Sequence, residues 1–212
     1  MRLAPIHRLP LRSFVVAASA LIALPAAAQS LDVPSGTYKA DPTHTSIVWK
    51  LNHLGFSSYT GMFERSGIDA TIELDAADVA NSSVTATIKG EEIQTLHPVA
   101  MTGKDFNAEV AGEKFINATA HPTISFESTG IEVTGENTAN ITGNLTFNNE
   151  THPLVLETTL NRAADHPMAG TPTLGISATA TVDRTQWGVN ALAGPIGTEV
   201  TVEIESEFQL VE

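Results

Sequence analysis

The chain has 212 residues, no cysteine, and 24 acidic against 11 basic residues, which gives a formal net charge of −13 at pH 7. This length fits a single domain, and a hydrophobic share of 42% excludes a wholly disordered chain. The acidic balance argues against nucleic-acid binding, because the phosphate backbone requires a basic surface. The lack of cysteine excludes a disulfide scaffold, a thiolate metal site, an iron–sulfur cluster and a cysteine nucleophile.

The first 28 residues are typical of a secretory signal peptide. Three arginines precede an apolar run over residues 14–24, and the small residues 26–28 follow Pro25. A helix of this run covers only about 16 Å, which is too short for a hydrocarbon core of about 30 Å. We therefore predict cleavage after Ala28, export to the periplasm or the medium, and a mature domain of residues 29–212. Cleavage removes three arginines and no acidic residue, so the mature chain has a net charge of −16.

The mature chain alternates apolar and polar residues with a period of two, which is typical of half-buried antiparallel strands. The alternation covers residues 47–52, 68–74, 83–89, 141–147, 154–160, 174–182 and 200–210. Turn residues separate these runs, at Asp41-Pro42, 75–83, 135–140, Asn148-Asn149 and 163–172. About eight strands at such short spacing predict an all-β domain, either a barrel or a sandwich.

One stretch, residues 101–120, departs from this period. Phe106 and Val110 have the spacing of a helical turn, although Gly103 and Gly112 weaken any helix there. We expect one or two short helices after Thr102, near residues 102–118, that cross one mouth of the barrel.

The inward faces leave two interpretations open. Large residues share these faces with several alanines and Gly143, and a small barrel either fills itself with side chains or holds one small ligand. An empty void of roughly 300 Å³ would cost about 7 kcal/mol at ~24 cal/mol per Å³. The barrel therefore either binds an apolar ligand or packs large side chains against small ones where it narrows.

Nine residues are candidates for the lining of such an interior. His53 lies in phase with Trp49, where it either bonds the polar end of a ligand or is satisfied by the backbone. Arg184 points inward near a strand end, where pairing with an acid is favoured over contact with a headgroup. The other candidates are the wall residues Trp49, Phe126 and Trp187, the entrance residues Phe56 and Phe63, and the gate residues Phe106 and Phe115. The alternative to an entrance role is core packing for Phe63, and the alternative to a wall role is capping of the barrel end for Trp187.

Neither a metal site nor a catalytic centre is predicted. The histidines form no His-x-His or His-x-x-x-His pair, and none of their spacings is that of metal ligands. The sequence contains no Gly-x-Ser-x-Gly motif, and its acids fall on polar strand faces. We therefore expect a protein that is not an enzyme and has no cofactor.

A set of short segments resembles the YceI-like family of secreted polyisoprenoid-binding proteins. The resemblance implies a lipocalin-like antiparallel barrel of about eight strands, whose apolar tunnel holds a long chain such as a polyisoprenoid, a quinone, a fatty acid or a fatty amide. It further implies a binding or carrier role, with transient contact to a membrane or a membrane protein. The matching segments are YKADPTH (38–44), NHLGFS (52–57), GMF (61–63), DF (105–106), KF (114–115), HPTISFEST (121–129), GNLT (143–146), DRTQWG (183–188) and GTEV (197–200).

The sequence departs from the family at Ala100, Met101 and Thr102, where the family often carries His-Leu-Arg. A basic group that would meet an anionic headgroup is therefore missing, and we expect a neutral ligand. Two alternatives to a carrier remain: a structural or adhesive exported β-domain with a packed core, and an enzyme built in a barrel.

Overall fold

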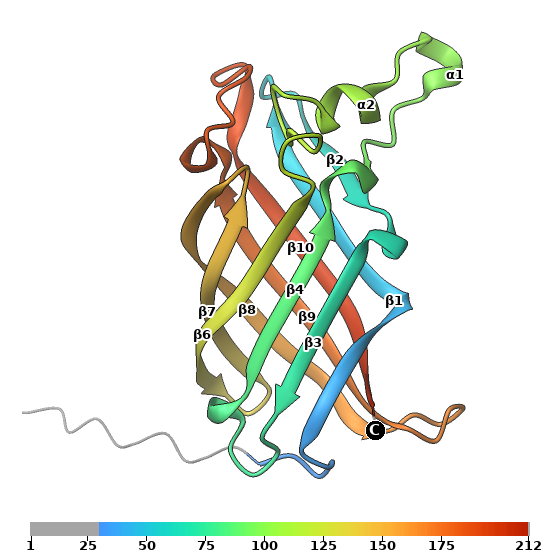
Figure 1. Ribbon diagram of the computed structural model, residues 1–212, viewed down its shortest axis with the longest axis vertical. Helices are drawn as coiled ribbons and strands as arrows, with labels where there is room; N and C mark the ends of the chain where they lie inside the picture. The colour runs from blue at the N-terminus through green and yellow to red at the C-terminus, as the bar shows by residue number, and fades with distance from the viewer. Residues whose placement is uncertain (1–29, 212) are drawn as a thin grey trace, which may run out of the picture.

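The period-two segments form antiparallel strands in the computed structural model, which describes residues 30–211 (Figure 1). The predicted signal peptide, residues 1–28, lies outside the described residues. The described part contains ten strands: β1 (Gly36–His53), β2 (Ser57–Phe63), β3 (Ile68–Leu74), β4 (Ser83–Lys89), β5 (Ile93–Gln94), β6 (Thr123–Gly135), β7 (Thr138–Phe147), β8 (Glu150–Asp165), β9 (Pro172–Asp183) and β10 (Ile196–Leu210).

Eight of these strands close a barrel. Their order is β1-β3-β4-β6-β7-β8-β9-β10, and β10 pairs with β1 from Tyr38 opposite Leu210 to His53 opposite Ile196. The short strands β2 and β5 lie outside the ring order, because β2 pairs with the second half of β1 and β5 pairs with β2. The predicted all-β fold, a single antiparallel barrel of about eight strands, is confirmed.

The turn predicted at Asp41-Pro42 is wrong, because β1 continues through it. The register with β10 shifts between Ala40, opposite Phe208, and Thr45, opposite Ser206. Proline has no N–H for the strand ladder and is tolerated at such an irregularity. The Asp41 carboxylate accepts a hydrogen bond from the Thr43 backbone N–H at 2.8 Å, and β1 bends instead of ending (Figure 1).

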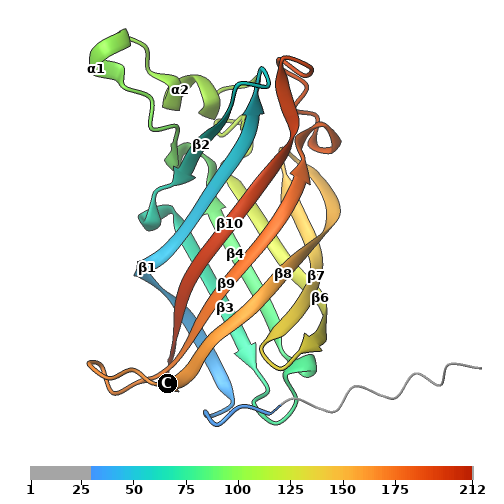
Figure 2. The same cartoon turned by 180° about the vertical axis from the view of Figure 1, so that it is seen from behind.

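Two short helices are present as predicted, but only the second lies wholly within residues 102–118. Helix α1 (Val99–Thr102) ends at Thr102, because Gly103 adopts a left-handed conformation with φ 69°. Helix α2 (Phe106–Ala111) begins after Asp105, whose side chain accepts from the Ala108 N–H at 3.1 Å. In Figures 1 and 2, α1 projects beyond one end of the barrel, here called the upper end, and does not cross the mouth. Within residues 30–211, no helix is long and apolar enough to span a membrane.

The interior is divided into two apolar clusters. The upper cluster is built around Trp49, Phe147 and Trp187, and the lower cluster around Tyr38 and Phe208. Inward-facing positions expected from the alternation are buried in both halves, including Trp49, Ile72, Phe126, Ala178, Ala180 and Phe208.

Candidate functional site

The upper half of the barrel contains buried polar atoms that have no hydrogen-bond partner. Three such atoms are Trp49 Nε1, Tyr59 Oη and His152 Nε2, and a fourth, Glu207 Oε2, belongs to another part of the described structure. Buried polar atoms in folded proteins nearly always have a partner, because an unmet donor or acceptor costs about 1–3 kcal/mol. We therefore regard the first three atoms, which we call the polar triad, as the candidate site.

Two members of the polar triad lie on neighbouring strands and stack. The rings of Trp49 on β1 and Tyr59 on β2 have centroids 6.1 Å apart and an interplanar angle of 21°. This arrangement depends on Gly61, which pairs with Trp49 across the strands. A Cβ atom at Gly61 would collide with the indole ring and with the Gln94 carbonyl oxygen. The glycine thus leaves the space in which the Trp49 side chain lies.

The third member, His152 on β8, borders the same cluster through Trp187. The 3-10 turn Arg184–Trp187 buries the Trp187 indole to 2% exposure, and its Nε1 donates to the Leu145 carbonyl at 3.1 Å. The His152 ring meets this indole edge-on, with centroids 5.0 Å apart. Trp187 and Trp49 belong to the upper cluster, and Tyr59 packs against it. The polar triad therefore borders one apolar cluster.

The guanidinium of Arg184 is held by the backbone. It donates to the carbonyls of Val189 at 2.6 Å, Gly197 at 3.1 Å and Ile196 at 3.3 Å. Burial lowers the pKa of this guanidinium, and the neighbouring Asp183 acts in the opposite direction. The side chain is buried, but three backbone carbonyls take the place of the predicted acid partner. Arg184 thereby fixes the loop between η4 (Arg184–Trp187) and β10.

The lower half contains an apolar cavity of about 70 Å³. This volume is far below the roughly 300 Å³ at which ligand pockets begin, so it does not meet the expectation of a ligand-sized void. The segment before β1 lies against it, with the Leu31 N–H bonded to the Ala76 carbonyl at 2.8 Å. The apolar lining residues are Leu31, Ile72, Leu74, Val79, Val84, Ala139, Ile131, Ile141, Leu160, Leu174 and Ile176.

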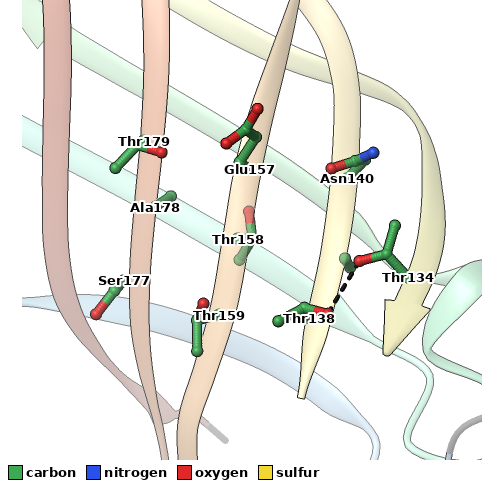
Figure 3. Close-up of a pocket in the computed structure, with 10 residues that line it drawn as sticks. Thr134, Thr138, Asn140, Glu157, Thr158, Thr159, Ser177, Ala178 and Thr179 are labelled. Atoms are coloured by element: carbon green, nitrogen blue, oxygen red, sulfur yellow. Dashed lines mark hydrogen bonds between the residues drawn. The ribbon is translucent and has the colours of Figure 1, made fainter. Parts of the chain in front are cut away.

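A larger depression of about 350 Å³ lies against β7, β8 and β9 (Figure 3). The side chains of Glu157, Thr159 and Thr179 are exposed, which places it on the outer face of the barrel. Figure 3 also shows the hydrogen bond of 3.0 Å from the Thr134 hydroxyl to Thr138. A surface lined by hydroxyls and a carboxylate is suited to water and does not suit an apolar chain.

The remaining predicted residues are dispersed. Phe63 and Phe126 are buried, each at 7% exposure, and Phe115 packs on the upper cluster. Phe106 instead stacks on His97 with centroids 4.3 Å apart, and Phe56 is 91% exposed. His53 is half-buried, and its ring lies 6.4 Å from that of Tyr59.

Of the predicted residues, Trp49 belongs to the polar triad, Trp187 contacts its member His152, and His53 lies beside its member Tyr59. Sequence reasoning missed Tyr59 and His152. His152 lies in phase with the inward residues Leu154 and Leu156, and this phase was the signal that could have found it. Within residues 30–211, no three His, Asp or Glu side chains are grouped closely enough to hold a metal ion.

The model of the YceI-like domain matches residues 38–208 of this sequence. The chain belongs to the YceI-like family. One relative is a UPF0312 protein from Pseudomonas fluorescens, which is 30% identical over 177 residues, 82% of this chain and 87% of the relative.

Two solved structures share the YceI-like fold. BcnA from Burkholderia cenocepacia superposes with a TM-score of 0.68 at 19% identity, over 79% of this chain and 98% of BcnA. A polyisoprenoid-binding domain from Saccharophagus degradans superposes with a TM-score of 0.59 at 11% identity, over 82% of this chain and 98% of that domain.

Proposed function

We propose that this YceI-like protein is an exported carrier that holds one long apolar chain inside the barrel, with a neutral polar end at Trp49, Tyr59 and His152. The observation that carries the proposal is the polar triad itself: three buried polar atoms without partners, all bordering one apolar cluster. A ligand that is apolar along its length and polar at one end would satisfy both features.

The chemistry of the polar triad favours an uncharged end group. The indole N–H only donates, the phenol donates or accepts, and the imidazole nitrogen does either according to its tautomer. A carbonyl, hydroxyl or amide would match such a set, as found in a quinone, an isoprenoid alcohol or a fatty amide. A phosphate would require cationic donors, and each nitrogen of the Arg184 guanidinium already donates to a backbone carbonyl. The replacement of His-Leu-Arg by Ala100, Met101 and Thr102 supports the same preference.

The apolar length of the ligand is supported by the fold and by the S. degradans neighbour, a polyisoprenoid-binding domain. Burial of a chain of roughly twenty carbons contributes a gross free energy of ~16 kcal/mol, at ~0.8 kcal/mol per CH₂. Because the lower cavity measures about 70 Å³, side chains of the lower cluster and the Leu31 segment would have to move to admit the chain. The gross free energy of burial exceeds the ~7 kcal/mol that opening a void of roughly 300 Å³ would cost.

Export to the periplasm or the medium is proposed from residues 1–28, whose basic start, apolar run and small-residue end fit a signal peptide. A carrier role without catalysis is proposed because the polar triad holds no nucleophile paired with a base. A second candidate, a structural or adhesive domain with a packed core, is favoured by the small size of the described interior cavity.

Thermal unfolding of delipidated protein separates these candidates. Geranylgeraniol at about one hundred times its dissociation constant should stabilise the carrier by about 2.7 kcal/mol, which is about 5–11 °C in Tm for a domain of this size. Geranylgeranyl pyrophosphate at the same concentration should give a smaller shift. If neither lipid changes Tm, the packed structural domain is the correct description. A larger shift with the pyrophosphate would keep the carrier role but refute the neutral end group.

A further inference from the structure

Large apolar side chains are exposed on three loops at the upper end of the barrel. We call them the apolar rim: Leu54 and Phe56 between β1 and β2, Leu96 and Met101 between β5 and α2, and Leu192 before β10. Their exposed fractions are 53%, 91%, 64%, 85% and 60% in that order. Single exposed apolar residues are common, but several at one end of a barrel are not expected by chance scatter.

The leucines of the apolar rim have an unusual backbone. Leu54, Leu96 and Leu192 have φ values of 56°, 57° and 55°, the left-handed region that favours glycine and asparagine. Glycine would adopt these angles without strain, as Gly55 does at φ 75°. Because the three side chains are largely exposed, packing within the barrel does not explain why leucine stands there.

The three loops lie at the same end of the barrel. The Leu54 N–H bonds to the Pro195 carbonyl at 3.0 Å, which joins the first loop to the third. Strand β5 pairs with Met62 and Phe63 of β2, so the second loop leaves alongside the β1–β2 hairpin. Figures 1 and 2 show α1, the hairpin and the loop before β10 together at the upper end.

The loops that carry the apolar rim contain few charged residues. Residues 54–56, 95–104 and 188–195 contain one Lys, Arg, Asp or Glu, namely Lys104, in a chain that carries −16 after residue 28. A specific protein interface is normally surrounded by polar and charged side chains that match those of the partner. The interface of a bilayer requires only apolar side chains of sufficient area, and a neutral lipid surface does not repel an acidic protein. These loops, with Lys104 as their one charged residue, therefore complement a neutral lipid surface.

We propose that the apolar rim inserts into the surface of a lipid bilayer. Docking would place the upper end of the barrel, with the polar triad beneath it, against the membrane from which an apolar chain would enter. The docking itself stands on the rim alone and does not depend on the lipid that the barrel carries, so it can be tested with the delipidated full mature chain.

The test is flotation of the protein with phosphatidylcholine vesicles. We expect the double variant Phe56→Ser with Met101→Ser to bind about one hundredfold more weakly than the wild type, at about tenfold for each side chain withdrawn from lipid. The matched control is Met168→Ser, because Met168 is equally exposed at 91% in the loop between β8 and β9, which lies at the opposite end of the barrel (Figure 1). The control should bind vesicles like the wild type.

A second variant distinguishes a docking role from a structural one. Leu96→Gly removes an apolar side chain and relieves a left-handed backbone, so vesicle binding should fall while Tm rises. Unchanged vesicle binding by the double variant, or an equal loss with Met168→Ser, would overturn the proposal. So would a wild-type dimer in sedimentation velocity that Phe56→Ser dissolves, in the absence of vesicle binding, because the rim would then be a contact between two copies of this chain.

Discussion

The two tyrosines of this chain differ in whether the hydroxyl has a hydrogen-bond partner, so they give a matched pair of variants. Tyr59 Oη is buried without a partner, whereas Tyr38 Oη donates to the Pro34 carbonyl at 2.7 Å, and its side chain has 0% exposure. Phenylalanine removes the hydroxyl and keeps the ring. Tyr59→Phe should therefore remove a desolvation cost, and Tyr38→Phe should remove a hydrogen bond.

The expected changes follow from the cost of an unmet buried polar group, about 1–3 kcal/mol. Taking the lower end, Tyr59→Phe should raise the Tm of delipidated protein by about 2–4 °C. Tyr38→Phe should lower Tm by at least the same amount, because the Pro34 carbonyl is left without its donor. Geranylgeraniol should raise the Tm of Tyr59→Phe by less than that of the wild type, because one hydrogen bond to the ligand is missing.

The assay is thermal unfolding by circular dichroism, with each protein measured before and after lipid is added. If Tyr59→Phe lowers Tm as Tyr38→Phe does, the Tyr59 hydroxyl has a structural role. The assignment of the polar triad as a ligand site would then be refuted.

Three further variants test other parts of the structure. Gly61→Ala should lower the free energy of unfolding in urea by about 1–3 kcal/mol, since its Cβ collides with the Trp49 indole. Arg184→Lys should lower it by about 2–4 kcal/mol, because an ammonium cannot reproduce the planar fork that meets three carbonyls. The hydrogen bond between Asp41 and His44 lowers the pKa of Asp41 from 3.8 to about 2 and, with Glu207 adding to it, raises that of His44 above 6.5. The Tm difference between wild type and His44→Ala should therefore be largest between pH 3.8 and 6.5, shrink on acidification towards pH 2, and shrink again as the pH rises through the raised pKa of His44.

Much of the fold was predictable because burial on one face of a strand imposes a period of two. The Asn148-Asn149 turn was also readable, since φ values of 49° and 63° suit asparagine in a two-residue hairpin. The turn at Asp41-Pro42 was predicted wrongly because proline interrupts the hydrogen bonds between strands both in a turn and in a bulge. Only the pairing with β10 shows that this site is a bulge. The start of α1 was missed because four residues carry too little helical periodicity.

The candidate site was only partly predictable, because a missing partner is a property of what faces a side chain. Alternation placed Trp49 inside the barrel but could not show that its indole nitrogen lacks an acceptor. The indole of Trp187 has the same chemistry and finds the Leu145 carbonyl. Phe56 was predicted at an entrance from its position beside a turn, and its exposure of 91% depends on how that turn projects.

The most direct test of the central claim is native mass spectrometry of the protein purified from its own cells without detergent. We predict one lipid per protein, and the released lipid should be a long apolar chain that contains no phosphate. A preparation with the mass of the polypeptide alone, from cells that contain such lipids, would contradict the carrier role. A bound prenyl phosphate or pyrophosphate would contradict the neutral end group at Trp49, Tyr59 and His152.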